Sequence, residues 1–228
     1  TKFLARMSHE IRTPINAIFG LNEMIVRESS EPAIQKYAKD IKDSSELLLD
    51  IVNDILDSSK IESGMMELVE NEYKLGGLID DMYNIINVKA KEKNLELEFD
   101  IDPGIPGKLY GDDKRIRQII LNLLSNAVKY TNQGKVILKM AWDKKGEDAV
   151  LYVSVKDTGI GIKEEDIDKL YDEFRRLDVE RNRNIEGTGL GMAIARQFLK
   201  MMGSELEIQS EYEKGSEFSF RLVQKIIE

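Results

Sequence analysis

Residues 113–130 read DKRIRQIILNLLSNAVKY, and this stretch decides how the C-terminal part of the chain folds. Asp112 and Asp113 provide a helix N-cap and an acidic first turn. Apolar side chains then recur every three or four positions, as on the buried face of an α-helix. They are Ile116, Ile119, Ile120, Leu123, Leu124, Ala127 and Val128. We therefore predict a largely buried helix over 113–130.

The other face of this helix carries a polar strip within about 80° of arc. Its members are Arg115, Gln118, Asn122, Asn126 and Lys129. Carboxamide oxygens are hard ligands that suit Mg²⁺, and a lysine supplies a positive charge for phosphate. An ordinary solvated helix face is the alternative interpretation.

The segments around this helix show strand and helix patterns in alternation. Strands are predicted at 68–69, 95–101, 136–142, 150–156, 206–208 and 218–222, and further helices at 75–91 and 190–202. Because strands lie in adjacent pairs, we expect an α+β two-layer sandwich, mainly antiparallel, with helices over one face.

Residues 157–161 read DTGIG and follow one of these strands. Strict alternation places Asp157 on the buried face, where a carboxylate needs hydrogen-bond partners. An adenine amino group would suit it, and Gly159 and Gly161 would let a ring approach the backbone. A turn-capping aspartate is the alternative.

Residues 187–191 read GTGLG and lead into a predicted helix. Backbone amides at a glycine-rich helix N-terminus attract phosphate, although the strand and the lysine of the Rossmann and P-loop motifs are missing. The preceding residues 175–186 are charged and contain no glycine. They are interpreted as a mobile lid over a nucleotide or as a disordered surface loop.

The N-terminal 64 residues predict two long helices joined around residues 29–32, where a serine is expected to cap the second helix. The second helix carries a heptad of Ile34, Ile41, Leu48 and Ile55. A hairpin cannot bury this seam alone, so we expect two copies to form a four-helix bundle. Docking of the hairpin on its own second domain is the alternative. Ser63 and Gly64 end the second helix and mark the boundary.

The only histidine of the chain, His9, lies in the first helix within SHEIRTP, residues 8–14. It projects roughly opposite the apolar stripe of that helix. Glu10 could accept an imidazole proton, and Thr13 lies one turn further on. A lone histidine is usually a surface or core residue, but a nucleophilic nitrogen, a base and a hydroxyl here share one helical region.

The composition excludes several classes of protein. A net charge of −9 argues against nucleic-acid binding. No apolar run reaches the roughly 20 residues that span a bilayer, so no membrane contact is expected within this chain. The absence of cysteine excludes disulfides and thiolate metal sites, and is compatible with a cytoplasmic location. Because the sequence begins at Thr1 in the middle of a predicted helix, we expect this chain to be a segment of a longer protein.

In combination, these motifs resemble those of the sensor histidine kinases of two-component systems. Residues 8–14 resemble the phospho-acceptor box, and residues 118–131 the asparagine box. Residues 157–161 resemble the first glycine box, and residues 171–174 the phenylalanine box. Residues 187–191 resemble the second glycine box, and residues 215–216 the last one. The motifs follow the family's order over nearly the whole chain.

The resemblance implies a dimerisation and histidine phosphotransfer domain at 1–64 and a catalytic ATP-binding domain at 65–228. It implies His9 as phospho-acceptor, Glu10 as its general base, and Thr13 as the residue that positions water when the partner regulator is dephosphorylated.

For the nucleotide site, the resemblance implies Asn126 as a Mg²⁺ ligand with Asn122 nearby, and Asp157 at adenine. Residues near ATP are implied to be Lys129, Tyr130, Gly159, Gly161, Gly187, Thr188, Gly189, Leu190 and Gly191.

The activity that the resemblance implies is ATP-dependent autophosphorylation of His9, followed by transfer to an aspartate of a response-regulator receiver domain. One alternative is a dimeric scaffold that binds nucleotide without turnover. Another is an ATPase or serine kinase on the same fold. Gln118 and Asn122, one turn before the two asparagines, are not bases, which disfavours direct hydrolysis.

Overall fold

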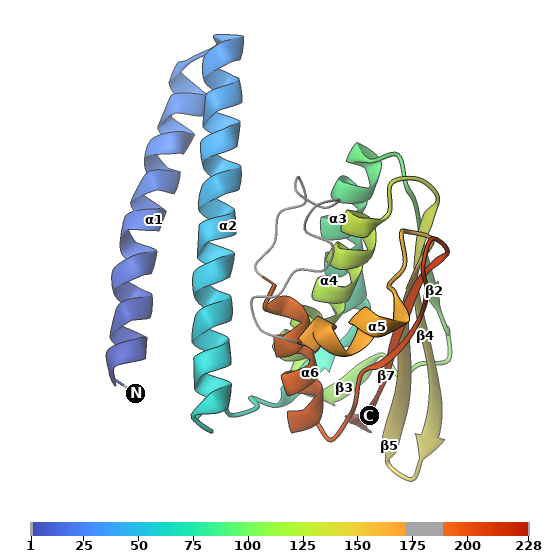
Figure 1. Cartoon of the computed structure of the whole chain (residues 1–228). Helices are drawn as coiled ribbons and strands as arrows, with labels where there is room; N and C mark the ends of the chain where they lie inside the picture. The colour runs from blue at the N-terminus through green and yellow to red at the C-terminus, as the bar shows by residue number, and fades with distance from the viewer. Residues whose placement is uncertain (1, 172–188, 228) are drawn as a thin grey trace. The chain divides into compact units, whose positions relative to one another are not determined.

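The structure, a computed structural model, describes residues 2–171 and 189–227, with side chains from residue 11 onward (Figure 1). Of these, residues 2–66 form one compact unit, and residues 67–171 together with 191–227 form a second. None of the described helices is long and apolar enough to cross a membrane.

The N-terminal unit is an antiparallel helical hairpin, as predicted, made of α1 (Lys2–Glu28) and α2 (Pro32–Glu62). Its core contains Ile15, Ala38 and Leu56, which are at most 7% exposed. Asn22 is also buried, and its Nδ2 donates to the Ala38 carbonyl at 2.9 Å. This bond joins the two helices near the loop and therefore opposes sliding of one helix along the other.

The expected serine cap of α2 is wrong. The N-cap is Glu31, whose side chain makes no capping bond, and Ser29 Oγ instead accepts from the Glu31 amide at 3.3 Å. Pro32 opens the helix, so one of the amides that a cap would satisfy is absent. The predicted end is confirmed, because Ser63 is the C-cap and Gly64 follows at φ 65°.

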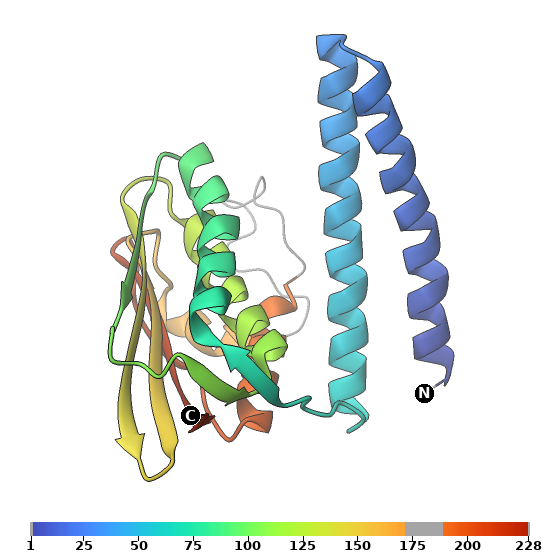
Figure 2. The same cartoon turned by 180° about the vertical axis from the view of Figure 1, so that it is seen from behind.

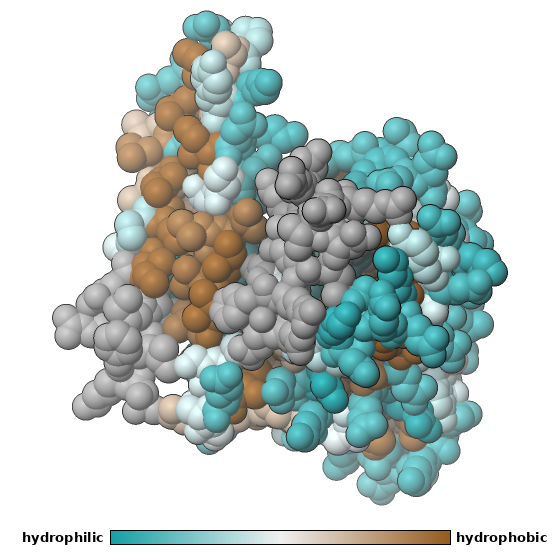
Figure 3. All heavy atoms as spheres, in the orientation of Figure 1, coloured by the Kyte–Doolittle hydropathy of each residue, from teal (hydrophilic) through white to brown (hydrophobic). Residues whose placement is uncertain are grey.

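The hairpin exposes a wide apolar surface, which Figure 3 shows as hydrophobic residues along the helices. The exposed apolar residues are Ile18, Leu21, Met24, Ile25 and Val26 of α1 and Tyr37, Ile41, Leu48 and Ile55 of α2. The three heptad positions Ile41, Leu48 and Ile55 are between 41% and 46% exposed. The seam predicted from the heptad is thus wider than α1 alone can cover.

The second unit is a seven-stranded sheet with helices on one face, as Figures 1 and 2 show. The sheet order is β1 (Asn71–Lys74), β3 (Lys108–Gly111), β7 (Gly215–Ile226), β5 (Asp148–Asp157), β4 (Lys135–Lys145) and β2 (Glu96–Ile101), and β6 (Glu207–Glu211) also pairs with β7. Only β2 and β4 pair in parallel among the described strands. The predicted, mainly antiparallel α+β sandwich is confirmed.

Three helices cover the sheet: α3 (Leu75–Glu92), α4 (Asp113–Tyr130) and α6 (Gly191–Met201). The short α5 (Glu164–Ile167) and η1 (Asp168–Tyr171) follow β5. Fully buried side chains of this layer and of the sheet form the core, among them Met82, Ile119, Ile120, Leu124, Leu138, Leu151 and Phe198. The outer face of the sheet instead carries cross-strand ion pairs, such as Lys139–Asp100 at 3.5 Å and Arg221–Glu207 at 3.6 Å.

The prediction of a strand at residues 68–69 is wrong, and the strand at 108–111 was not predicted. The first strand is β1, of which only Tyr73 is buried, and it pairs with β3 at the sheet edge. Each strand has only four residues, too few for a clear apolar alternation, so pairing defines them: β1 pairs with β3, and β3 also pairs with β7. Val69 donates its amide to Asp112 Oδ2 at 2.8 Å instead.

The loop after β5 packs against the β6–β7 hairpin backbone to backbone. Gly161 has φ 62°, and a Cβ there would lie 2.0 Å from the Glu211 carbonyl oxygen. Gly215 has φ 114°, and a Cβ there would lie 2.1 Å from the Asp157 carbonyl oxygen. Glycine is therefore required at both positions by close packing as well as by the backbone angle.

We predict that Gly161→Ala destabilises the chain by about 3 kcal/mol or more, because strain and overpacking add. Gly146→Ala is the matched control: its φ is 67°, but no atom lies within 4 Å of a Cβ there. Gly146→Ala should lower the free energy of unfolding by only about 1–2 kcal/mol, because backbone strain is its only cost. Urea unfolding measures both free energies, and equal losses would contradict the packing argument.

Candidate functional site

The N-terminus of α4 is anchored by Asp112, which is 4% exposed. Its Oδ1 accepts from the Arg115 amide at 3.0 Å, and its Oδ2 accepts from the Val69 amide at 2.8 Å. The predicted N-cap is confirmed. The same carboxylate also attaches the segment that precedes β1 to the helix, so the start of α4 has a fixed position.

The two asparagines of the polar strip lie together on α4. Asn126 Nδ2 donates to Asn122 Oδ1 at 3.5 Å. Asn122 Nδ2 is buried and has no hydrogen-bond partner among the described residues. The first residue of α6 closes over this group, since a Cβ on Gly191 would lie 2.4 Å from Asn122 Oδ1. An unpaired buried donor is costly and marks a position where a ligand could supply an acceptor.

Other members of the strip have partners within the protein. Arg115 donates to Gln118 Oε1 at 2.7 Å, and its guanidinium lies 4.5 Å from the centre of the Phe198 ring. Lys129 Nζ lies 4.9 Å from the centre of the Tyr130 ring. The roles of Lys129 and Tyr130 near ATP stay predictions.

Asp157 ends β5 on the buried face, as its alternation predicted, with 6% of its surface exposed. Its Oδ1 accepts from the Gly159 amide at 2.8 Å. Burial raises the pKa of the Asp157 carboxyl, while hydrogen bonds from the backbone amides of Gly159 and Ser216 oppose that rise. A carboxylate offers about four acceptor positions, so it has capacity for a further donor.

The end of α4 meets the 157–161 loop. The Tyr130 carbonyl accepts from the Ile160 amide at 3.2 Å. Thr131 is fully buried, and its hydroxyl donates to the Ala127 carbonyl at 2.7 Å. A Cβ on Gly159 would lie 2.4 Å from the Tyr130 carbonyl oxygen and 2.9 Å from both the Thr131 hydroxyl and Asp157 Oδ1. The loop and the helix end therefore form one polar cluster.

Sequence reasoning placed Thr131 and Ser216 within the boxes at 118–131 and 215–216 but gave neither residue a role in this cluster. Thr131 is the first residue after α4, and Ser216 pairs with Asp157 across the sheet. The position of Thr131, a polar residue directly after a buried helix, could have indicated its part in the site. The position of Ser216 beside Asp157 depends on strand register, which the sequence does not reveal. Both predicted glycines meet protein atoms, so the need for glycine follows from packing, and contact of Gly159 or Gly161 with a nucleotide stays a prediction.

Several predicted site residues are only partly described. His9 and Glu10 lie in α1, and their side chains are outside the described set. Thr13, one turn after His9, is exposed. Gly187, Thr188 and the expected lid at 175–186 lie outside the described residues, while Gly189 (φ 73°) and Leu190 directly precede α6.

The described residues contain no group of three or more histidine, cysteine, aspartate or glutamate side chains that could hold a metal ion. The carboxamide oxygens of Asn122 and Asn126 on α4 are hard ligands of the kind that Mg²⁺ accepts.

The sandwich with its polar helix strip defines a class of ATP-binding domain. The family of histidine kinase-, DNA gyrase B- and HSP90-like ATPases matches residues 111–226, and the chain belongs to it. The His Kinase A phospho-acceptor domain matches residues 1–64. Together they identify the chain as a histidine kinase catalytic core.

Relatives of known name are similar over almost the whole chain. Hybrid signal transduction histidine kinase B of Dictyostelium discoideum is 38% identical over 96% of this chain and 11% of its own length. The sensor protein GacS of Pseudomonas syringae pv. syringae is 40% identical over 96% of this chain and 24% of its own. The chain thus spans a quarter or less of these relatives.

Solved structures share the fold. Full-length ShkA in complex with AMPPNP superposes with a TM-score of 0.78 at 28% identity, over 99% of this chain and 46% of that one. The catalytic domain of the histidine kinase ThkA gives a TM-score of 0.51 at 25% identity, over 69% of this chain and 95% of that one.

We predict that Asp157→Asn lowers the affinity for adenine nucleotide by at least about tenfold. Without ligand, the variant should be as stable as the parent or more stable at pH 7. The pKa of Asp157 is raised in the folded state. The buried charge therefore destabilises the fold above that pKa, and this cost disappears as the pH falls below the ordinary value of about 3.9.

Calorimetric ADP titration and thermal unfolding between pH 4 and 8 check both parts. The stability difference between variant and parent should shrink toward acid pH. Unchanged ADP affinity, or a difference that grows toward acid pH, would contradict this assignment.

Proposed function

We propose that this chain transfers the γ-phosphoryl group of ATP to His9 and then passes it to an aspartate of a response-regulator receiver domain. One observation carries the proposal: the only histidine of the chain lies in the segment that matches a phospho-acceptor domain, and an ATPase-family domain follows it. The use of ATP also supports a cytoplasmic location for this part of the protein.

At the base-binding end, we assign Asp157 as the acceptor for the adenine amino group. Its carboxylate is already oriented by the Gly159 amide and is adjacent to the buried Thr131 hydroxyl through Gly159. Such preorganisation supports recognition, because no further side-chain ordering is needed when a base binds. A carboxylate also favours an amino group over the carbonyl that guanine has at the same ring position.

At the phosphate end, Asn126 and Asn122 fit a Mg²⁺–phosphate group. Asn126 uses its Nδ2 on Asn122, so its Oδ1 would be the Mg²⁺ ligand, and the unpaired Asn122 Nδ2 would donate to an anionic oxygen. The chemistry supplied at this position is neutralisation of charge on the phosphate oxygens. The N-terminus of α6, which meets Asn122 through Gly191, adds amides with partial positive charge.

In the transfer step, a ring nitrogen of His9 attacks the γ-phosphorus. The bond to the β–γ bridging oxygen breaks, and its electron pair leaves with ADP. Glu10 accepts or orients the proton on the other ring nitrogen. The exposed Thr13, one turn along α1, positions water when the phosphorylated regulator is hydrolysed. Catalysis rests on positioning rather than on a protein nucleophile other than His9.

We further propose that the hairpin forms a homodimer, a four-helix bundle. The support is the apolar surface that the hairpin exposes, in which Ile41, Leu48 and Ile55 continue the heptad. Apolar stripes at heptad spacing are typical of helices that pack on further helices.

We predict that the chain incorporates label from γ-labelled ATP in an acid-labile, alkali-stable form, as a phosphoramidate should be, and that His9→Gln incorporates none. Asn126→Ala should lower the rate by roughly 100-fold or more, because the metal ligand is lost. ADP titration provides the control for folding of His9→Gln. Label retained in His9→Gln, or tight nucleotide binding without label in the parent, would contradict the proposal; the second result would favour a scaffold.

We predict that Leu48→Glu weakens dimerisation by at least about 100-fold, since a charge would have to be buried in the seam. Asp43→Lys is the matched control, because Asp43 is exposed on α2 about 140° around the helix from Leu48. Analytical ultracentrifugation of both variants beside the parent checks this. A monomeric parent would refute the dimer, and a dimeric Leu48→Glu would exclude this face as its interface.

A further inference from the structure

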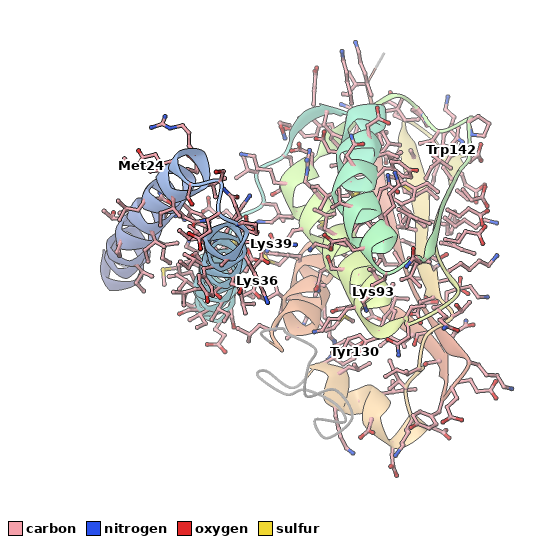
Figure 4. All side chains as sticks on the ribbon, turned by 90° about the horizontal axis from the view of Figure 1, so that it is seen from above. Met24, Lys36, Lys39, Lys93, Tyr130 and Trp142 are labelled. Carbon is pink, nitrogen blue, oxygen red and sulfur yellow. The ribbon has the colours of Figure 1, made fainter. Side chains whose placement is uncertain are left out.

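Lys93 occupies the C-terminal end of α4, although it belongs to the turn after α3. Its Nζ donates to the carbonyls of Val128 at 2.9 Å, Lys129 at 2.7 Å and Thr131 at 3.4 Å. Figure 4 shows Lys93 and Tyr130 at the same end of this helix. The last carbonyls of a helix have no intrahelical donors, and a cation there satisfies them and opposes the negative end of the helix dipole.

The backbone holds Lys93 in this position. The Lys93 amide donates to the Ala90 carbonyl at 3.2 Å, Asn94 adopts φ 56°, and the Leu95 amide returns to the same Ala90 carbonyl at 2.9 Å. This turn closes α3 and leads directly into β2. The ammonium group thus reaches α4 from a rigid connection between two core elements.

The carbonyls of residues 127–131 all accept hydrogen bonds, and Lys93 is the donor to three of these carbonyls. The Ala127 carbonyl accepts from Thr131, through its amide at 3.1 Å and its hydroxyl at 2.7 Å. The Tyr130 carbonyl accepts from the Ile160 amide at 3.2 Å. The same turn of helix that Lys93 holds is therefore the one that meets the loop after Asp157.

We propose that Lys93 is a positioning residue for the base-binding end of the nucleotide site. By holding the last turn of α4, it keeps Tyr130 and Thr131 against the 157–161 loop, and so keeps Asp157 oriented for adenine. The inference rests on the proposed function, because it assigns Lys93 to the adenine site formed by Asp157. Lys93 itself contacts neither base nor phosphate in this proposal.

The test compares Lys93→Met with Lys91→Met. Methionine keeps an apolar stem of similar length without the charge, and Lys91 is an exposed lysine in the last turn of α3. ADP affinity is measured by calorimetry well below the unfolding temperature, and kcat and KM for ATP from labelling rates. Lys93→Met should weaken ADP binding and raise KM by about tenfold, with kcat at saturating ATP within about threefold. Lys91→Met should match the parent.

Lys93→Arg should bind ADP with intermediate affinity, because a guanidinium can donate to several carbonyls. It also provides the test if Lys93→Met fails to fold. ADP affinity unchanged in a Lys93→Met that is less stable than the parent would reduce Lys93 to a stabilising contact and overturn the inference. An arginine variant that loses stability but no ADP affinity would overturn it in the same way. A parent chain that binds no ADP would overturn the proposed function as well, which distinguishes the two failures.

Discussion

The burial of one face of α4 against the sheet is the constraint on which the rest of the site depends. Ile119, Ile120 and Leu124 are fully buried, and each contributes about 1.5–3 kcal/mol relative to exposure. A helix held in this way cannot rotate, so Asn122 and Asn126 on its other side have a fixed direction. The polar face thus derives its preorganisation from the apolar one.

Both ends of α4 are fastened by groups from outside the helix. Asp112 caps the first turn and also accepts from the Val69 amide. Lys93 caps the last turn by donating to its carbonyls. The last turn in turn meets the loop that orients Asp157. Stability and recognition are therefore coupled here: the buried carboxylate has a raised pKa, a cost that binding of a donor would relieve.

The hairpin differs from the second unit because two helices cannot fully bury the apolar seam between them. It buries Ile15 and Ala38 between α1 and α2 and exposes Ile41, Leu48 and Ile55 on the next side. The Asn22–Ala38 hydrogen bond adds a polar contact within that narrow core. Buried polar groups at single positions can specify how helices align, at some cost in stability. The exposed stripe then remains available for a second copy.

By itself, the sequence determined whatever depends on local periodicity: the two long helices, α4 with its N-cap at Asp112, and the buried side of Asp157 on β5. Helical and strand patterns repeat within a few residues, so they are legible along the chain. Tertiary structure alone decided β1 and β3, which are too short to show a clear alternation and exist through pairing, β1 with β3 and β3 also with β7. It also decided the partners of Thr131, Ser216 and Lys93, because contacts between residues far apart in the chain depend on register and packing, which no local pattern encodes.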